Sequence, residues 1–127
     1  MITKKFKEYN GAEPSVVTVG TFDGIHLGHQ DIINKLNEIS KIKKLKSIVL
    51  SFFPHPKIVL QNSSDIMLIN SLDEKIDILK KYNIDYFVIK DFDIAFSRLT
   101  AIEFVRDILV NKLNAKHIIV GYDHHFG

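Results

Sequence analysis

The sequence has 127 residues, no cysteine, and a formal net charge of +2 from 17 basic and 15 acidic side chains. This length allows one domain, the lack of cysteine excludes disulfides and thiolate metal sites, and the balanced charge does not support binding to nucleic acid or a membrane surface. The chain has neither a secretory signal nor a run of roughly 18 apolar residues that could span a membrane. We therefore expect a cytoplasmic protein.

The first 40 residues predict a strand followed by a helix. Residues 1–15 are mostly polar and leave room for one early edge strand. The β-branched run at 16–20 predicts a buried strand. Apolar residues at spacings of three and four predict a helix from about 27 to 40. The lysines between 41 and 46 suit the negative end of that helix, with a nucleic-acid patch as the alternative.

The strand and helix are joined by Gly20-Thr-Phe-Asp-Gly-Ile-His-Leu-Gly-His29. Glycines let the backbone approach a ligand closely, and the start of a helix suits phosphate. His26 and His29 are three residues apart, so on a helix they share one face and can donate to phosphate oxygens. The alternative is a tightly packed turn beside two solvated histidines. The Walker A, dinucleotide-binding and zincin patterns are all absent.

A second strand is predicted at 47–53, where a continuous apolar run suits a parallel sheet covered on both faces. It stops at Pro54-His-Pro56, which we expect to form an extended loop. That loop lies at the carboxyl end of its strand, where open α/β sheets bind ligands, although it could simply end the strand. Residues 57–60 suit a short strand or helix, and 61–65 suit a loop that could act as a flap.

The rest of the chain alternates between helices and strands. Serine or threonine followed by glutamate three residues later predicts capping boxes at Ser71 and Thr100. The first of these helices should end near Asn83 and lead to a strand at 86–90, followed by a connecting loop at 91–99. We expect a strand at 116–120 after the second helix. That helix has a predicted apolar face made of Ile102, Val105, Ile108, Leu109 and Leu113.

The resulting βαβαβαβ order predicts an α/β fold in which a parallel sheet has helices on both faces. Residues 20–29, 54–56 and 121–127 each follow a predicted strand. Since parallel strands end at the same edge of a sheet, we expect these three segments to converge.

The order Gly-Thr-Phe-Asp-Gly-x-His-x-Gly-His resembles the nucleotidylyltransferase superfamily with its H-x-G-H signature. The fuller pattern is similar to the adenylyltransferase part of prokaryotic riboflavin kinase/FAD synthetase. Three further stretches carry the resemblance, at 51–56, 96–105 and 120–127. It implies a Rossmann-like nucleotidylyltransferase fold.

The resemblance also implies residue roles. The catalytic residues would be His26 and His29, and the metal would lie near Asp123. The residues implied to bind nucleotide are Gly20, Thr21, Phe22, Asp23, Gly24, His26, Gly28 and His29. Those implied to bind flavin are Phe53, Pro54, His55, Pro56 and Phe126. His124 departs from the phenylalanine of many members, and His124 with His125 could instead form a transition-metal site.

By this resemblance, the protein transfers AMP from ATP to FMN with Mg²⁺ and forms FAD and pyrophosphate. Family members are longer and carry a C-terminal riboflavin kinase domain, so residues 1–127 resemble a truncated N-terminal domain of weak or lost activity. The partners would be ATP and FMN, without nucleic acid or membrane. The alternatives are another small-molecule adenylyl- or cytidylyltransferase and a non-catalytic nucleotide- or flavin-binding module.

Overall fold

The computed structural model describes residues 1–22, 27–54, 56–61 and 72–120. Five strands form one sheet in the order β1-β4-β3-β2-β5, and every neighbouring pair is parallel. The strands are β1 (Ile2–Lys5), β2 (Ser15–Val19), β3 (Lys46–Phe53), β4 (Tyr86–Asp91) and β5 (Ala115–Ile119). The parallel α/β sheet is therefore confirmed, and the early strand is confirmed as the edge strand β1.

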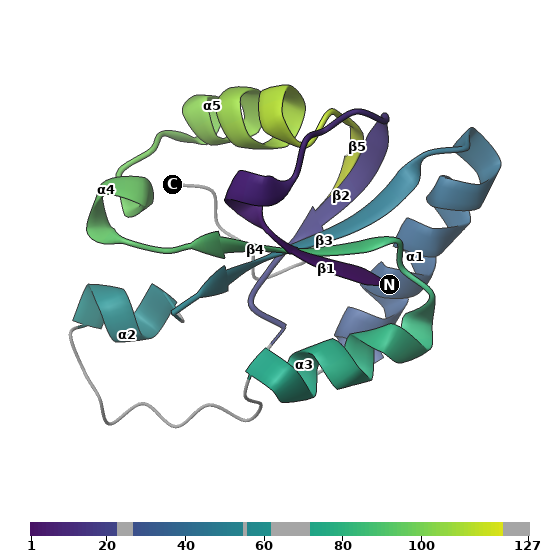
Figure 1. The fold of residues 1–127 in the computed structure, drawn as a ribbon, viewed down its shortest axis with the longest axis horizontal. Coiled ribbons are helices and arrows are strands. Elements are labelled where there is room, and N and C mark those ends of the chain that lie inside the picture. Colours follow the sequence, from purple (N-terminus) through teal and green to yellow (C-terminus); the bar gives the residue numbers. More distant parts are fainter. Residues whose placement is uncertain (23–26, 55, 62–71, 121–127) are drawn as a thin grey trace.

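Helices cover both faces of this sheet (Figure 1). One face carries α1 (Leu27–Lys43) and α3 (Leu72–Leu79), which continues into the 3₁₀ turn η2 (Lys80–Tyr82). The other face carries the 3₁₀ turn η1 (Phe6–Glu8) and α5 (Ala101–Glu103), which runs directly into η3 (Phe104–Lys112). Two short helices, α2 (Pro56–Gln61) and α4 (Ile94–Ser97), follow the carboxyl ends of β3 and β4.

The sheet separates two apolar cores, because side chains alternate between its faces. Val16, Val49 and Phe87 pack under α1 and α3 with Ile33 and Leu36 of α1. The opposite core contains Val17, Leu50 and Val88 from the same three strands, packed against Leu109 and Leu113. Burial on both faces explains why β2 and β3 have continuous apolar sequences rather than alternating ones.

Two segments that the sequence left irregular or undecided are helical. Residues 57–60 belong to α2, and residues 94–97 form α4 within the expected connecting loop. The side chain of Asp93 caps α4 by accepting a hydrogen bond from the Phe96 backbone N–H at 2.7 Å. Aspartate is a strong N-cap residue, and this cap explains how a four-residue helix forms there.

The predicted apolar face of the helix after Thr100 is partly wrong. Ile102 is 75% exposed, whereas Phe104 is 6% exposed and faces the core. The cause is η3, a π-helix whose wider turns are closed by hydrogen bonds such as Leu113 N–H to Ile108 O at 3.2 Å. Because of the wider turn, the buried residues Phe104, Leu109 and Leu113 lie five and four positions apart. Ile102 consequently lies on the side of the helix that faces solvent.

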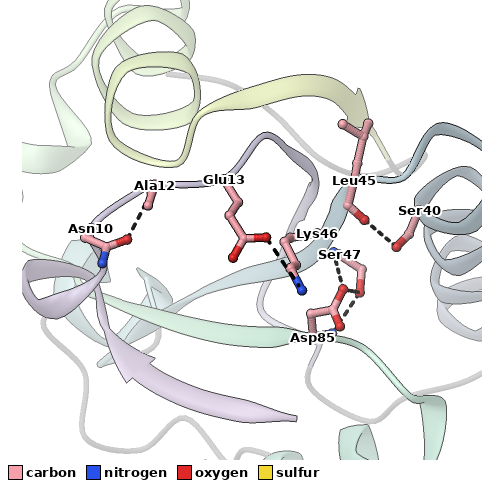
Figure 2. Close-up of polar contacts among 8 residues, drawn as sticks. All are labelled: Asn10, Ala12, Glu13, Ser40, Leu45, Lys46, Ser47 and Asp85. Carbon is pink, nitrogen blue, oxygen red and sulfur yellow. Dashed lines mark hydrogen bonds and ion pairs between the residues drawn. The ribbon is translucent and has the colours of Figure 1, made fainter.

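Polar contacts hold the amino ends of the strands (Figure 2). Ser47 at the start of β3 bonds to Asp85 just before β4, and Lys46 lies 3.7 Å from Glu13. Ser40 Oγ donates to the Leu45 carbonyl at 2.6 Å and shapes the turn from α1 into β3. These contacts lie at the opposite edge of the sheet from the segments predicted to bind ligand.

Candidate functional site

The site predicted from sequence follows three strands that are neighbours in the sheet. β2 lies between β3 and β5, and the three strands are parallel. Residues 20–22, Phe53–Pro54 and Val120 therefore leave the sheet at one edge. The convergence of the strand ends is confirmed. Residues 23–26, 55 and 121–127 lie outside the described part of the chain, so the placements of Asp23, Gly24, His26, His55, Asp123, His124, His125 and Phe126 stay predictions.

The turn after β2 is attached to β3. The Gly20 N–H donates to the Leu50 carbonyl at 3.0 Å and so extends the strand ladder by one bond. The Ser51 hydroxyl lies 3.4 Å from the Thr21 carbonyl oxygen, which makes a long hydrogen bond. Ser51 is 2% exposed, so its hydroxyl is held at the base of the turn. These two contacts join the predicted nucleotide-binding segment to the strand that leads to the predicted flavin-binding segment.

Phe22 has an uncommon backbone conformation. Its φ is 52°, in the left-handed region that costs a residue other than glycine about 1–3 kcal/mol. Its residue surface is 3% exposed, and its ring packs in the core beneath α1 with Ile33 and Leu36. The ring is thus an internal support of the turn, and the assignment of Phe22 to the nucleotide-binding residues stays a prediction.

His29 is the third residue of α1, as the sequence predicts. It is half-buried and lies four and seven residues before Ile33 and Leu36, which are both fully buried. Residues at these spacings share a helix face, so His29 opens the inward face of α1. Its imidazole lies 5.1 Å from the Phe22 ring, measured between centroids, at an interplanar angle of 55°. Gly28 precedes it within the first turn of the helix.

The segment after β3 is anchored at its start. The Phe92 N–H donates to the Phe53 carbonyl at 3.1 Å, and the Phe53–Pro54 peptide bond is cis. The Phe53 residue is 51% exposed, so its ring is available to a ligand. Pro56 does not extend the loop as the sequence prediction had it but is the first residue of α2. Proline suits that position because its missing N–H would have no partner within the helix.

An aromatic cluster beside this edge was missed in the sequence prediction. Neighbouring rings of Phe52, Phe92, Phe96 and Phe104 lie 5.6 to 5.9 Å apart between centroids. The Lys90 ammonium lies 4.5 Å from the Phe96 centroid and donates to the Asp91 carbonyl at 2.9 Å. A sequence signal existed, since Phe92 and Phe96 are four residues apart, but α4 was not predicted. The cluster gives the carboxyl ends of β3 and β4 a rigid apolar support.

The described residues contain neither a cluster of metal ligands nor a membrane-spanning helix. No group of three or more His, Cys, Asp or Glu side chains in the described part of the chain could hold a metal ion. Over the same residues, no helix is long and apolar enough to cross a membrane. The described residues therefore offer no metal-ligand set of their own.

Comparison of the sequence with known proteins identifies a family for this chain. A family model described as FAD synthetase matches residues 9–127. A bifunctional riboflavin kinase/FMN adenylyltransferase of Buchnera aphidicola (subspecies Acyrthosiphon pisum) is 41% identical over 89% of this chain and 36% of its own length. Proteins of the same description from Listeria monocytogenes and Escherichia coli K12 are each 35% identical, over 88% and 91% of this chain. The chain thus spans only 36–37% of the length of these relatives.

A solved structure from Streptococcus pneumoniae, described as a macrolide-efflux protein, superposes with a TM-score of 0.88 at 32% identity. The superposition covers 100% of this chain and 43% of that one, and it supports the Rossmann-like fold. The family model covers nearly the whole chain, including the strand, turn and helix that carry His29. The chain belongs to the FAD synthetase family.

Proposed function

We propose that this protein transfers AMP from ATP to FMN and forms FAD and pyrophosphate. The observation that carries the proposal is the junction between β2 and β3, where Gly20 and Thr21 bond to Leu50 and Ser51. It joins Gly20 and Thr21 to the strand that ends at Phe53, which supports a shared site for the two predicted segments. The match of the FAD synthetase model to residues 9–127 supports this pairing of substrates. We assign residues 1–127 to adenylyl transfer, and not to the riboflavin kinase activity that the relatives' names include.

The proposed reaction depends mainly on the correct positioning of FMN and ATP. An oxygen of the FMN phosphate attacks the α-phosphorus of ATP, the bond from that phosphorus to the bridging oxygen breaks, and pyrophosphate leaves. The nucleophile is already an anion, so no serine or cysteine nucleophile is needed. We assign to His29, and to His26, hydrogen bonds to the phosphate oxygens on which charge develops. The amino end of α1 adds favourable N–H groups and dipole.

The remaining assignments follow from the same proposal. Phe53, Pro54, His55, Pro56 and Phe126 would contact flavin, and the exposure of Phe53 supports its part in this set. Mg²⁺ would arrive bound to the ATP phosphates, where it neutralises their charge, with Asp123 as the proposed neighbour. We place the reaction in the cytoplasm, and the balanced charge of the chain supports small-molecule partners rather than nucleic acid.

The direct test incubates the purified chain with ATP, MgCl₂ and FMN, and measures FAD by chromatography and pyrophosphate by a coupled assay. We expect the two products in equal amounts. Loss of a single oxyanion donor lowers turnover by about 10²–10³-fold, so His29→Ala should fall by that factor. The matched control is His117→Ala, which removes a half-buried histidine from β5 and should keep turnover within a few-fold.

The other outcomes separate the alternatives. Pyrophosphate release with phosphopantetheine or nicotinamide mononucleotide, but not with FMN, would assign a different transferase. Saturable binding of FMN and a non-hydrolysable ATP analogue without any product would favour a binding module. Unchanged turnover in His29→Ala would remove that imidazole from the mechanism.

A further inference from the structure

We propose that Phe22 is a positioning residue that holds the His29 imidazole in the orientation needed to reach the substrate phosphates. The catalytic part of this inference rests on the proposed adenylyl transfer. The structural part, that the Phe22 ring sets the position of the His29 ring, does not depend on any reaction. The two parts can therefore be tested separately.

The first argument is the backbone of Phe22. A φ of 52° is uncommon for a residue other than glycine, and a bulky side chain makes it a clear outlier. Glycine would adopt this conformation more easily, yet the position carries a large ring that is 3% exposed. The ring lies against Gly20 and packs with Ile33 and Leu36 of α1. A strained residue that fills such a place suggests a requirement for the ring itself.

The second argument is the contact between the two rings. The Phe22 and His29 centroids are 5.1 Å apart at an interplanar angle of 55°, and this separation is typical of aromatic rings in contact. His29 is in the first turn of α1, and the next residues of the same face, Ile33 and Leu36, pack in the core that contains Phe22. The imidazole is therefore bounded on the core side by the phenyl ring. Removing that ring would free the imidazole to turn inward, away from the edge where the three strands end.

The third argument is the close approach of Gly20. A Cβ added at Gly20 would lie 3.0 Å from Cε2 of the Phe22 ring and 3.4 Å from Cδ2 and Cζ. The ring is thus confined by the Gly20 backbone as well as by the residues of α1. The three positions Gly20, Phe22 and His29 form one packed series that runs from the end of β2 to the start of α1. A displacement at Gly20 should therefore reach His29 through the Phe22 ring.

The test is made on the 127-residue chain, with the imidazole carbons labelled and followed by NMR without substrate. Phe22→Leu should change the His29 ring-proton shifts and give new nuclear Overhauser contacts from these protons to the methyl groups of Ile33 and Leu36, because the imidazole turns inward. In the assay, turnover should fall about 10- to 100-fold, as expected for a misplaced catalytic group, whereas KM for ATP and FMN should stay within about twofold. Phe22→Tyr keeps the ring and should restore most of both properties.

The matched control is Phe87→Leu, which removes a fully buried ring from the same core on β4. It should lower stability as Phe22→Leu does, while leaving the His29 shifts and turnover close to the starting protein. Should Phe22→Leu fail to fold, Gly20→Ala provides the second variant. Its new Cβ requires the Phe22 ring to move by a few tenths of an ångström, so the His29 shifts should change although residue 20 keeps its small size.

Unchanged His29 shifts in a folded Phe22→Leu protein would overturn the inference. So would His29 shifts that change as much in Phe87→Leu as in Phe22→Leu. Loss of turnover without any change in those shifts would also overturn it. A different result concerns the proposed function alone. If the His29 shifts move as expected but His29→Ala keeps full turnover, Phe22 positions His29 and the catalytic role of His29 is wrong.

Discussion

Ser47 and Asp85 exchange three hydrogen bonds across the amino ends of β3 and β4 (Figure 2). The Ser47 N–H and hydroxyl donate to Asp85 Oδ2 at 2.9 and 3.1 Å, and the Asp85 N–H donates to Ser47 Oγ at 2.8 Å. Ser47 is 1% exposed, so these donors have little access to water. The pair sets the start of two central strands whose other ends lead to the candidate site.

Asp85→Ala should therefore lower the free energy of unfolding by about 1–3 kcal/mol, because it leaves the buried Ser47 groups without their acceptor. Urea denaturation followed by circular dichroism measures this change. The control is Asp77→Ala, whose exposed ion pair with Lys80 spans 3.9 Å and should contribute at most about 1 kcal/mol. Equal losses in the two variants would contradict a structural role for the Ser47–Asp85 pair.

Tyr9 should make the protein sensitive to alkaline pH. Burial, followed by the nearby Tyr86, Glu13 and Asp85, raises the pKa of Tyr9 from 10.0 to about 12. The fold favours the neutral phenol, so this stabilisation is complete below pH 10 and is lost as pH rises from 10 to 12. The slope from one such group is at most about 1.4 kcal/mol per pH unit.

The measurement for Tyr9 is the urea midpoint at pH 9, 10, 11 and 12, compared with Tyr9→Phe. That variant has no hydroxyl at position 9 and should lose less stability over the same interval, while the other tyrosines and the lysines still titrate in both proteins. Parallel curves would show that Tyr9 titrates with its ordinary pKa in the folded protein.

Because η3 has π-helical turns, we expect truncation of Phe104 to destabilise the protein far more than truncation of Ile102. Phe104→Ala should destabilise by about 3–5 kcal/mol, because it opens a cavity in the core beneath η3. Ile102→Ala should change stability by less than about 0.5 kcal/mol, since Ile102 is 75% exposed. Thermal denaturation of both variants gives the comparison. The reverse order would mean that the segment is an ordinary α-helix with Ile102 inside.

Thr100 should contribute to stability through its capping box. Its hydroxyl accepts from the Glu103 N–H at 3.1 Å, and the Glu103 carboxylate accepts from the Thr100 N–H at 3.0 Å. Thr100→Ala should cost about 1 kcal/mol, whereas Thr100→Ser keeps the acceptor and should cost less. The hydrogen bond from the Thr100 backbone N–H, followed by the Thr100 side chain, lowers the pKa of Glu103. Thr100→Ala keeps the backbone N–H, so only the side-chain part of the difference from the starting protein should shrink in acid, as Glu103 is protonated.

Local signals in the sequence predicted much of the fold. The β-branched run of β2 and the apolar run of β3 identified the central strands, because burial on both faces leaves no polar alternation. The Thr100–Glu103 capping box was confirmed bond for bond, since both partners lie within four residues. The start of α1 at Leu27 and the place of His29 in its first turn were predicted from glycine spacing and helical periodicity.

Features that depend on contacts distant in sequence were not predicted. The left-handed φ of Phe22 depends on a packing space made by Gly20, α1 and the sheet. The π-helical turn depends on how the Phe104 and Leu109 side chains fit the core, which a 3.6-residue period cannot encode. Helix α4 differs from these two features, because only its contact with Phe52 is distant in sequence, while its Asp93 cap is a local signal that was missed.

The sequence by itself determined the alternation of strands and helices and the family resemblance that the comparisons bear out, and it predicted candidate residues for the chemistry. These properties are local, since they depend on residue type and spacing along the chain. Only the tertiary structure decided that β1 pairs with β4 at the sheet edge, that Ile102 faces solvent, and that Phe22 packs against His29. The physical reason is that strand partners and helix faces are selected by the packing of residues far apart in sequence, where the free energy of burial outweighs local preference.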